Sequence, residues 1–161
     1  MRPTFRLLVS HPAHFVSLGF GAGLAPRAPG TVGSFVAWAL FAAGEACLPA
    51  WPVWLAALAL TVAFVAGAAC IARTGRALGE VDHGAIVWDE FVAVWLVLWL
   101  IPSGWAWQLA GVLVFRFFDI LKPWPIRAAD RRFKHGPGVM FDDLLAALFS
   151  LACLFAVAAL I

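Results

Sequence analysis

Long stretches without charge alternate with short polar segments along this chain. Residues 46–72, 91–115 and 144–161 contain no charged side chain. A membrane-spanning helix needs about 20 apolar residues, and short Pro- or Gly-containing breaks such as 48–52 and 102–104 are typical of tight hairpins. The pattern predicts an all-α fold, a polytopic membrane helical bundle with about five spanning or partly re-entrant helices. We expect these helices at residues 33–50, 52–72, 84–101, 104–121 and 143–161.

Composition supports a membrane protein over the alternative of a soluble helical bundle. Of the residues, 64% are hydrophobic and 12% charged, whereas soluble domains carry about a quarter charged residues. The uncharged runs also lack the polar face of a soluble helix. The length predicts one domain, residues 1–161. No nucleic-acid partner is expected at a net charge of +2, and the cysteines include no CxxC pair that would suggest zinc.

The basic residues predict an orientation. All of them precede the first expected helix, lie between the second and third, or surround the connection between the fourth and fifth. Because Lys and Arg collect in cytoplasmic loops, we expect the N-terminus in the cytoplasm and, after five spans, the C-terminus outside. We expect no cleaved signal peptide. Residues 125–134 predict a short basic surface helix that contacts anionic lipids.

Most of the carboxylates collect in three places, each at the cytoplasmic end of an expected helix. Charges at this depth are costly unless they are paired, face a cavity or bind metal. Several carboxylates brought together repel one another, and hard oxygen ligands suit Mg²⁺. We therefore expect a magnesium site. The candidate catalytic residues are Asp82, Asp89, Glu90, Asp119, Asp142 and Asp143.

The spacing of Asp82, Asp89 and Glu90 would place them on one face of a continuous helix, although Gly84 interrupts that stretch. Asp142 and Asp143 point about 100° apart on a helix, so they would serve one site only in different roles. One of the two is expected to cap a helix N-terminus.

Arg116, Asp119 and Lys122 are spaced by three and share a helix face. This stripe predicts either a metal ligand between two phosphate-binding cations or an ion-pair ladder. Residues 19–34 form a glycine-rich segment leading into a helix, where backbone N–H groups could cradle phosphate. Thr31 and Ser34 are candidate phosphate ligands there, or simple helix caps.

Four blocks together resemble the bacterial phosphatidylglycerophosphatase A family. They are GFGAGLAPRAPGTVGS (19–34), DHGAIVWDE (82–90), FRFFDILKPWPI (115–126) and GPGVMFDD (136–143). The resemblance implies magnesium-dependent hydrolysis of the terminal phosphate of phosphatidylglycerophosphate, giving phosphatidylglycerol. It also implies a helical fold in the bacterial inner membrane and a relation to small soluble helical bundles of the same family. The orientation predicted from the basic residues would make the active site face the cytoplasm, where all the candidate carboxylates are expected.

The resemblance assigns roles to individual residues. The family's basic positions fall on Arg116 and Lys122, which would bind phosphate. Its acidic positions fall on all six candidate carboxylates, Asp82, Asp89, Glu90, Asp119, Asp142 and Asp143. Of these, the expected metal ligands are Asp89, Glu90, Asp119 and Asp143. The sequence departs from the family's pattern at Ala93 and Ala147, where glycines are common, and at Pro137. Whether an Asp or a water molecule attacks the phosphate stays open, as does the oligomeric state.

Other classes make demands that this chain does not meet. A lipid phosphatase of the PAP2 type needs a histidine in a PSGH-like block, but Trp105 follows Pro102-Ser103-Gly104. A CDP-alcohol phosphotransferase needs four spaced aspartates after a DG pair. The remaining alternative is a small transporter or ion-binding membrane protein, which would carry its charges near the bilayer midplane.

Overall fold

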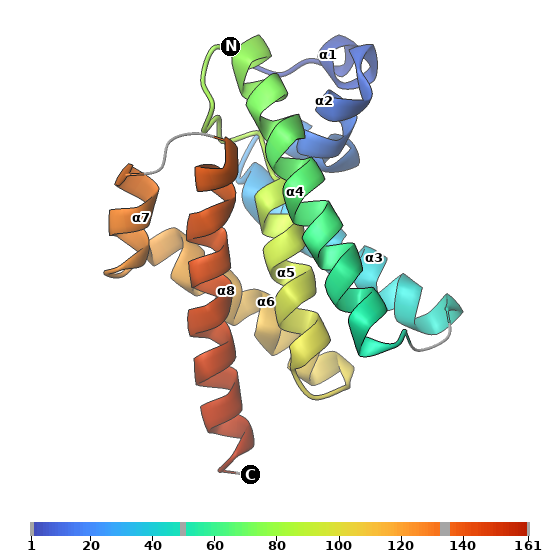
Figure 1. The fold of residues 1–161 in the computed structure, drawn as a ribbon, viewed down its shortest axis with the longest axis vertical. Helices are drawn as coiled ribbons and strands as arrows, with labels where there is room; N and C mark the ends of the chain where they lie inside the picture. Colours follow the sequence, from blue (N-terminus) through green and yellow to red (C-terminus); the bar gives the residue numbers. More distant parts are fainter. Residues whose placement is uncertain (1, 49–50, 133–135, 161) are drawn as a thin grey trace.

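The chain folds as a bundle of helices, seen in a computed structural model that describes residues 2–48, 51–132 and 136–160. All regular structure in those residues is helical, which confirms the all-α prediction. Figure 1 shows the longest helices running along the molecule, with the short N-terminal ones gathered at one end. In chain order the elements are α1 (Phe5–Ser10), α2 (Pro12–Ser17), the 3₁₀ helix η1 (Gly19–Leu24), α3 (Pro29–Cys47), α4 (Val53–Leu78), α5 (Trp88–Leu100), α6 (Trp105–Leu121), α7 (Ile126–Arg132) and α8 (Gly136–Ala158).

Three described helices are long and apolar enough to cross a membrane: α3, α4 and residues 138–158 of α8. The other two expected spans are shorter, with 13 residues in α5 and 17 in α6. At 1.5 Å per residue they extend about 20 Å and about 26 Å, less than the roughly 30 Å of a hydrocarbon core. The five predicted helices are therefore present. α5 and α6 are each too short to cross the hydrocarbon core upright, as expected for a partly re-entrant pair.

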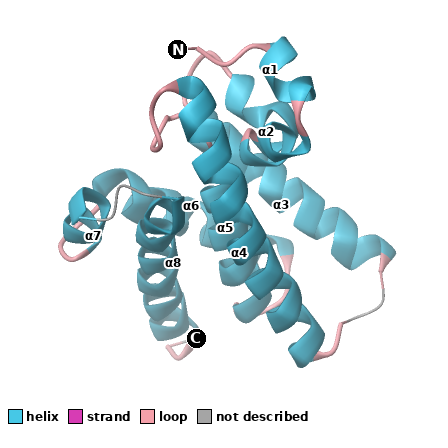
Figure 2. Cartoon of the chain, turned by 45° about the horizontal axis from the view of Figure 1, so that its top comes forward, coloured by secondary structure: helices cyan, strands magenta, loops and turns pink. Residues whose placement is uncertain are grey.

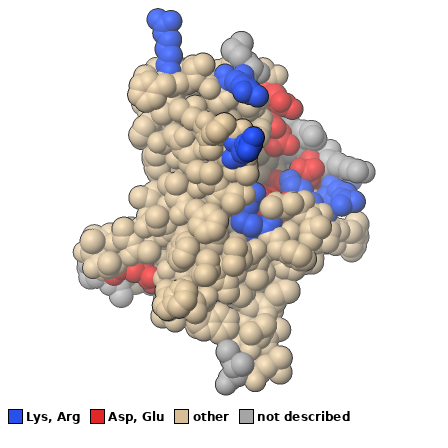
Figure 3. All heavy atoms as spheres, turned by 180° about the vertical axis from the view of Figure 1, so that it is seen from behind, with Lys and Arg blue, Asp and Glu red and all other residues tan. Residues whose placement is uncertain are grey.

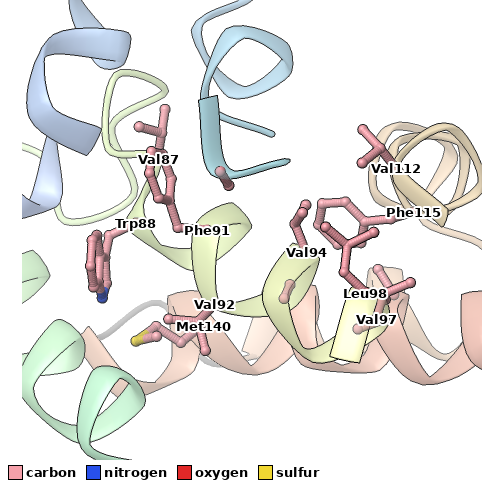
Figure 4. Close-up of a cluster of buried hydrophobic side chains, with 14 of the residues drawn as sticks. Val87, Trp88, Phe91, Val92, Val94, Val97, Leu98, Val112, Phe115 and Met140 are labelled. Atoms are coloured by element: carbon pink, nitrogen blue, oxygen red, sulfur yellow. The ribbon is translucent and has the colours of Figure 1, made fainter. Parts of the chain in front are cut away.

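α5 is the central helix of the bundle. It packs against α3, α4, α6 and α8, and its mainly apolar sequence leaves few side chains exposed, as expected for a helix that is hydrophobic all round. Phe91 and Val97 are fully buried on it. Figure 4 shows its side chains meeting Val112 and Phe115 of α6 and Met140 of α8. The position of side chains in the first turn of α5 is therefore fixed by the packing of this helix against four others.

The connection between α4 and α5 is not helical, which corrects the predicted start of the third helix at residue 84. α4 ends at Leu78, and Gly79 adopts a left-handed conformation (φ 84°) that stops the helix. α5 begins only at Trp88. The continuous helix that would have placed Asp82 on one face with Asp89 and Glu90 therefore does not exist.

The N-terminal helices cover one end of the bundle (Figure 2), and the sequence pattern did not identify α1 and α2. Their anchors are polar: His14 Nδ1 lies 2.9 Å from Thr74 Oγ1 on α4, and the Ser17 carbonyl accepts a hydrogen bond from the Val87 amide. In η1, a Cβ on Gly23 would lie 2.0 Å from the Ala85 carbonyl oxygen. The glycines of this segment thus allow close packing onto the loop before α5.

Candidate active site

Three carboxylates from two helices converge at the end of the bundle nearest the N-terminal helices. Asp89 and Glu90 lie in the first turn of α5, and Asp143 lies in the second turn of α8. One oxygen from each lies within 4.8 Å of the others. Asp89 is 8% exposed and Asp143 4%, so water can do little to screen their mutual repulsion.

The donor set fits a divalent cation. Glu90 Oε2 and Asp143 Oδ2 are buried and have no hydrogen-bond partner among the described residues. A buried carboxylate oxygen without a partner is costly, and a cation bound between these groups would remove both the missing contact and the repulsion. Mg²⁺ binds oxygen ligands through one or two carboxylates together with water and substrate phosphate. The residues present therefore match magnesium better than a softer metal.

Arg116 of α6 lies against this acidic cluster. Its Nη1 is 2.6 Å from Asp119 Oδ2 and 3.5 Å from Glu90 Oε1. The Nε of Arg116 is buried and has no hydrogen-bond partner among the described residues. The guanidinium thus neutralises part of the acidic charge and keeps donor capacity that a phosphate group could use.

The first turn of α3 completes this side of the site. A Cβ placed on Gly30 would lie 2.2 Å from Glu90 Oε1 and 3.3 Å from Arg116 Nη1. Only glycine allows the helix backbone to approach the two side chains this closely. The N-terminus of α3, where backbone N–H groups are free and the helix dipole favours anions, is therefore next to the cluster.

Lys122 does not continue the helix face of Arg116 and Asp119, although its spacing had predicted this. α6 ends at Leu121, and Lys122 is left-handed (φ 41°), because the helix stops before Pro123. Its ammonium donates to Asp130 of α7 at 2.7 Å and to Asp142 of α8 at 2.5 Å. Burial by itself lowers the pKa of Lys122, but these two hydrogen bonds outweigh burial and raise the pKa above its ordinary value. Lys122 stays charged and joins α6, α7 and α8.

Asp142 and Asp143 divide their roles, as their angular separation predicted: Asp142 pairs with Lys122 and Asp143 joins the carboxylate cluster. Neither is a helix cap, which corrects the expected N-cap, because α8 already begins at Gly136. Of the four expected metal ligands, the structure groups three, while Asp119 pairs with Arg116. Asp119 nonetheless remains an electrostatic neighbour of Asp143.

The three other candidate residues are Asp82, Ser34 and Thr31. Asp82 is exposed in the turn before α5. Ser34 is fully buried, and its hydroxyl donates to the Gly30 carbonyl within its own helix at 3.0 Å, so it offers nothing to a phosphate. Thr31 is partly exposed in the first turn of α3. In Figure 3, most basic and acidic atoms lie at the top and upper right of the face drawn, and a smaller group of acidic atoms lies apart at the left.

A family model described as phosphatidylglycerophosphatase A matches residues 15–158. The chain belongs to this family. The matched region contains every carboxylate and cation of the site, together with the N-terminal turn of α3. The resemblance read from the four sequence blocks is thereby confirmed.

Relatives in this family cover nearly the whole chain. A phosphatidylglycerophosphatase A from Haemophilus influenzae is 42% identical over 96% of this chain and 94% of its own length. One from Escherichia coli is 38% identical over 93% of this chain and 86% of its own. A third relative, from Bacteroides thetaiotaomicron, is 38% identical over 84% of this chain, and its name refers to a phosphatidylinositol-3-phosphatase. No solved structure matches the chain.

The positions where the chain departs from the family's pattern are accommodated. Ala93 and Ala147 are buried in the core, so alanine keeps the close helix packing expected there. Pro137 belongs to the first turn of α8, where proline is tolerated because its missing N–H would have no helical partner. The sequence indicated Gly30 only as one residue of the glycine-rich segment 19–34, and it missed Asp130. Asp130 could have been noticed as the only acid in the basic 125–134 segment.

Proposed function

We propose that this chain hydrolyses the terminal phosphate of phosphatidylglycerophosphate to phosphatidylglycerol and inorganic phosphate, using Mg²⁺. The observation that carries the proposal is the convergence of Asp89, Glu90 and Asp143 beside Arg116, in a chain of this family. The net reaction consumes one water molecule. The ester bond between phosphorus and the headgroup oxygen breaks, a bond forms between phosphorus and the oxygen of that water, and a proton from the water ends on the headgroup oxygen, which leaves as the alcohol.

In this proposal Asp89, Glu90 and Asp143 hold the cation, which when bound neutralises charge on the phosphoryl oxygens and orients the reacting groups. Arg116 binds phosphate with the donors that Asp119 and Glu90 leave free. Asp119 fixes the guanidinium by its 2.6 Å contact. Lys122 contributes positive charge at the rim of the cluster and holds α7 and α8 together.

The backbone at the start of α3 is the second phosphate-binding element that we propose. Gly30 and Thr31 are in its first turn, where N–H groups lack helical acceptors. The Gly30 position also lies directly against Glu90 and Arg116. A phosphate placed there would meet the positive end of the helix dipole and the guanidinium together.

We also propose that the site faces the cytoplasm from the bacterial inner membrane. Three apolar helices support membrane association, and the basic residues gather in the segments that the positive-inside rule assigns to the cytoplasm. The carboxylates lie at one end of the helices. This placement does not suit the transporter alternative, which would need them near the midplane.

The test is phosphate release by the purified full-length protein from phosphatidylglycerophosphate in detergent micelles, with Mg²⁺ titrated against a chelator. We expect release to require the divalent cation and Asp89→Asn to abolish it. Glu80→Gln, at an exposed glutamate before α5, is the matched control and should behave as the unchanged protein. Full activity in chelator would refute the metal role, and no release under any condition would refute the substrate.

A second substrate deserves the same assay because of the name of the Bacteroides relative. Phosphatidylinositol 3-phosphate also carries a phosphomonoester on a membrane lipid, so the same carboxylates and Arg116 could act on it. Competition between the two lipids at equal concentration measures the preference directly. A higher kcat/KM for phosphatidylinositol 3-phosphate would replace the proposed substrate while keeping the reaction.

A further inference from the structure

A second site lies at the opposite end of the bundle from the acidic cluster. A cleft of about 570 Å³ opens between the C-terminal half of α3 and the N-terminal half of α4, with α5 as its floor. Figure 2 shows α3 and α4 as the arms of a hairpin. The walls are apolar, from residues such as Leu40, Ala59 and Ala63, with Trp95 and Trp99 below. This volume is in the range of pockets that hold small ligands.

One carboxylate, Glu45 of α3, lines this otherwise apolar cleft. It has no ion pair among the described residues; its partner is the neutral amide of Gln108 on α6, at 2.5 Å. Gln108 is 8% exposed, and its Oε1 accepts a hydrogen bond from Trp38 Nε1 at 2.8 Å. Because Trp38 can only donate, the Gln108 amide must present its N–H groups to Glu45.

This hydrogen-bonded chain keeps Glu45 as an acceptor. Trp38 donates to Gln108, and Gln108 donates to the Glu45 carboxylate. The carboxylate accepts this one hydrogen bond and keeps other lone-pair positions open. Glu45 is exposed, so a ligand in the cleft can reach these open lone-pair positions, and an ammonium group there would make a charge-assisted hydrogen bond to the carboxylate. The sequence supplies no cation nearby, since no Lys or Arg occurs between Arg27 and Arg73 or between Arg76 and Arg116.

The distance from the acidic cluster makes this a separate site. Gly30 contacts Glu90, and Glu45 follows 15 residues later on the same helix. At 1.5 Å per residue, Gly30 and Glu45 are about 22 Å apart along α3. Trp51 and Leu48, which border the cleft, belong to the uncharged α3–α4 connection. An aromatic residue there suits the boundary between hydrocarbon and headgroups.

We propose that this cleft binds a phospholipid whose headgroup carries a primary ammonium, from the leaflet opposite the acidic cluster. An acyl chain occupies the cleft between its apolar walls, and the ammonium donates to Glu45 beside Trp51. The charge complementarity selects the headgroup: an anionic headgroup would meet the carboxylate with repulsion, and a trimethylated ammonium would bring charge without N–H donors. The site is a lipid-binding site independent of the phosphatase reaction.

The experiment is native mass spectrometry of the full-length protein in detergent, titrated with phosphatidylethanolamine, phosphatidylcholine or phosphatidylglycerol of identical chains. We expect phosphatidylethanolamine to bind about tenfold tighter than the other two, the size of one charge-assisted hydrogen bond. Glu45→Gln should remove this preference. Glu80→Gln, the same change at an exposed glutamate outside the cleft, should keep it.

A second pair of variants tests the cleft itself. Ala59→Trp places a large side chain in the cleft and should weaken the binding of all three lipids. Ala57→Trp, on the exposed side of α4, should leave their binding unchanged. Unchanged phosphate release would show that each variant is folded. A phosphatidylethanolamine preference that survives Glu45→Gln would overturn the proposal, as would unchanged lipid binding by Ala59→Trp.

Discussion

Gly30→Ala is the sharpest perturbation that the site offers. The added Cβ would lie 2.2 Å from Glu90 Oε1, where ordinary contact begins at 3.4 Å, so the carboxylate must retreat by about 1.2 Å. It is the end of a flexible side chain and can move. The fold should therefore survive while Glu90 leaves its place beside Arg116 and the proposed cation.

The geometry gives the size of the effect. A misplacement of about 1 Å in a reacting assembly can cost about 100-fold in rate, equivalent to about 2.7 kcal/mol of transition-state stabilisation. Stability should change little, because Gly30 lies in the first turn of α3, where alanine gains less over glycine than the about 1 kcal/mol of a helix interior. We expect about a 100-fold loss in kcat/KM with a nearly unchanged Tm.

Phosphate release and thermal unfolding of the purified variant measure both quantities. Gly44→Ala, in the same helix, is the matched control and should keep full activity, because its added Cβ would meet no described residue within 4 Å beyond its own helix backbone. Shortening the acid should make room, so Gly30→Ala combined with Glu90→Asp should be more active than Gly30→Ala alone. If Gly30→Ala keeps nearly normal activity, Glu90 does not act from the position described here.

Three further outcomes are expected. Arg116→Ala should lower kcat/KM by about 10- to 150-fold, the range of one charge-assisted phosphate contact. Arg116→Lys should not restore kcat/KM, because an ammonium group lacks the planar fork of a guanidinium. A fully active Arg116→Lys would count against a bidentate contact between Arg116 and phosphate. Asp119→Asn should shift the magnesium dependence if it contributes to the metal site and lower only kcat/KM if it orients Arg116, as a magnesium titration would reveal. Reporter fusions should place the N-terminus in the cytoplasm and the C-terminus outside, since three and five crossings are both odd; a cytoplasmic C-terminus would refute the orientation.

The sequence predicted those parts of the fold that depend on local pattern. Charge-free length located α4, the α5–α6 hairpin and α8, and the 100° rule separated Asp142 from Asp143. The direction of Lys122 was missed because the stripe assumed a continuous helix, whereas Pro123 ends α6 one residue earlier. That signal was present in the sequence and outweighed the three-residue spacing.

Other features depend on tertiary contacts that no local pattern encodes. Gly30 looked like one more residue of a glycine-rich turn, and its importance follows from Glu90 and Arg116, which arrive from α5 and α6. The grouping of Asp89, Glu90 and Asp143 without Asp119 likewise depends on how α5 and α8 cross. Sequence could identify the acidic set, but it could not divide that set between metal and guanidinium.

The short length of α5 has a consequence for the surrounding bilayer. Its 13 residues extend about 20 Å, and the turn after it, at Pro102 and Ser103, is exposed. If that turn reaches the far polar boundary, Asp89 and Glu90 would lie about 10 Å below the near boundary only if the hydrocarbon layer kept its ordinary thickness of about 30 Å. Hydrophobic mismatch of this kind is relieved by local thinning of the membrane. We therefore expect the bilayer to be locally thinner around the α5–α6 hairpin, so that lipid headgroups lie at the depth of the carboxylates. The scissile phosphate could then reach the site without leaving its own leaflet.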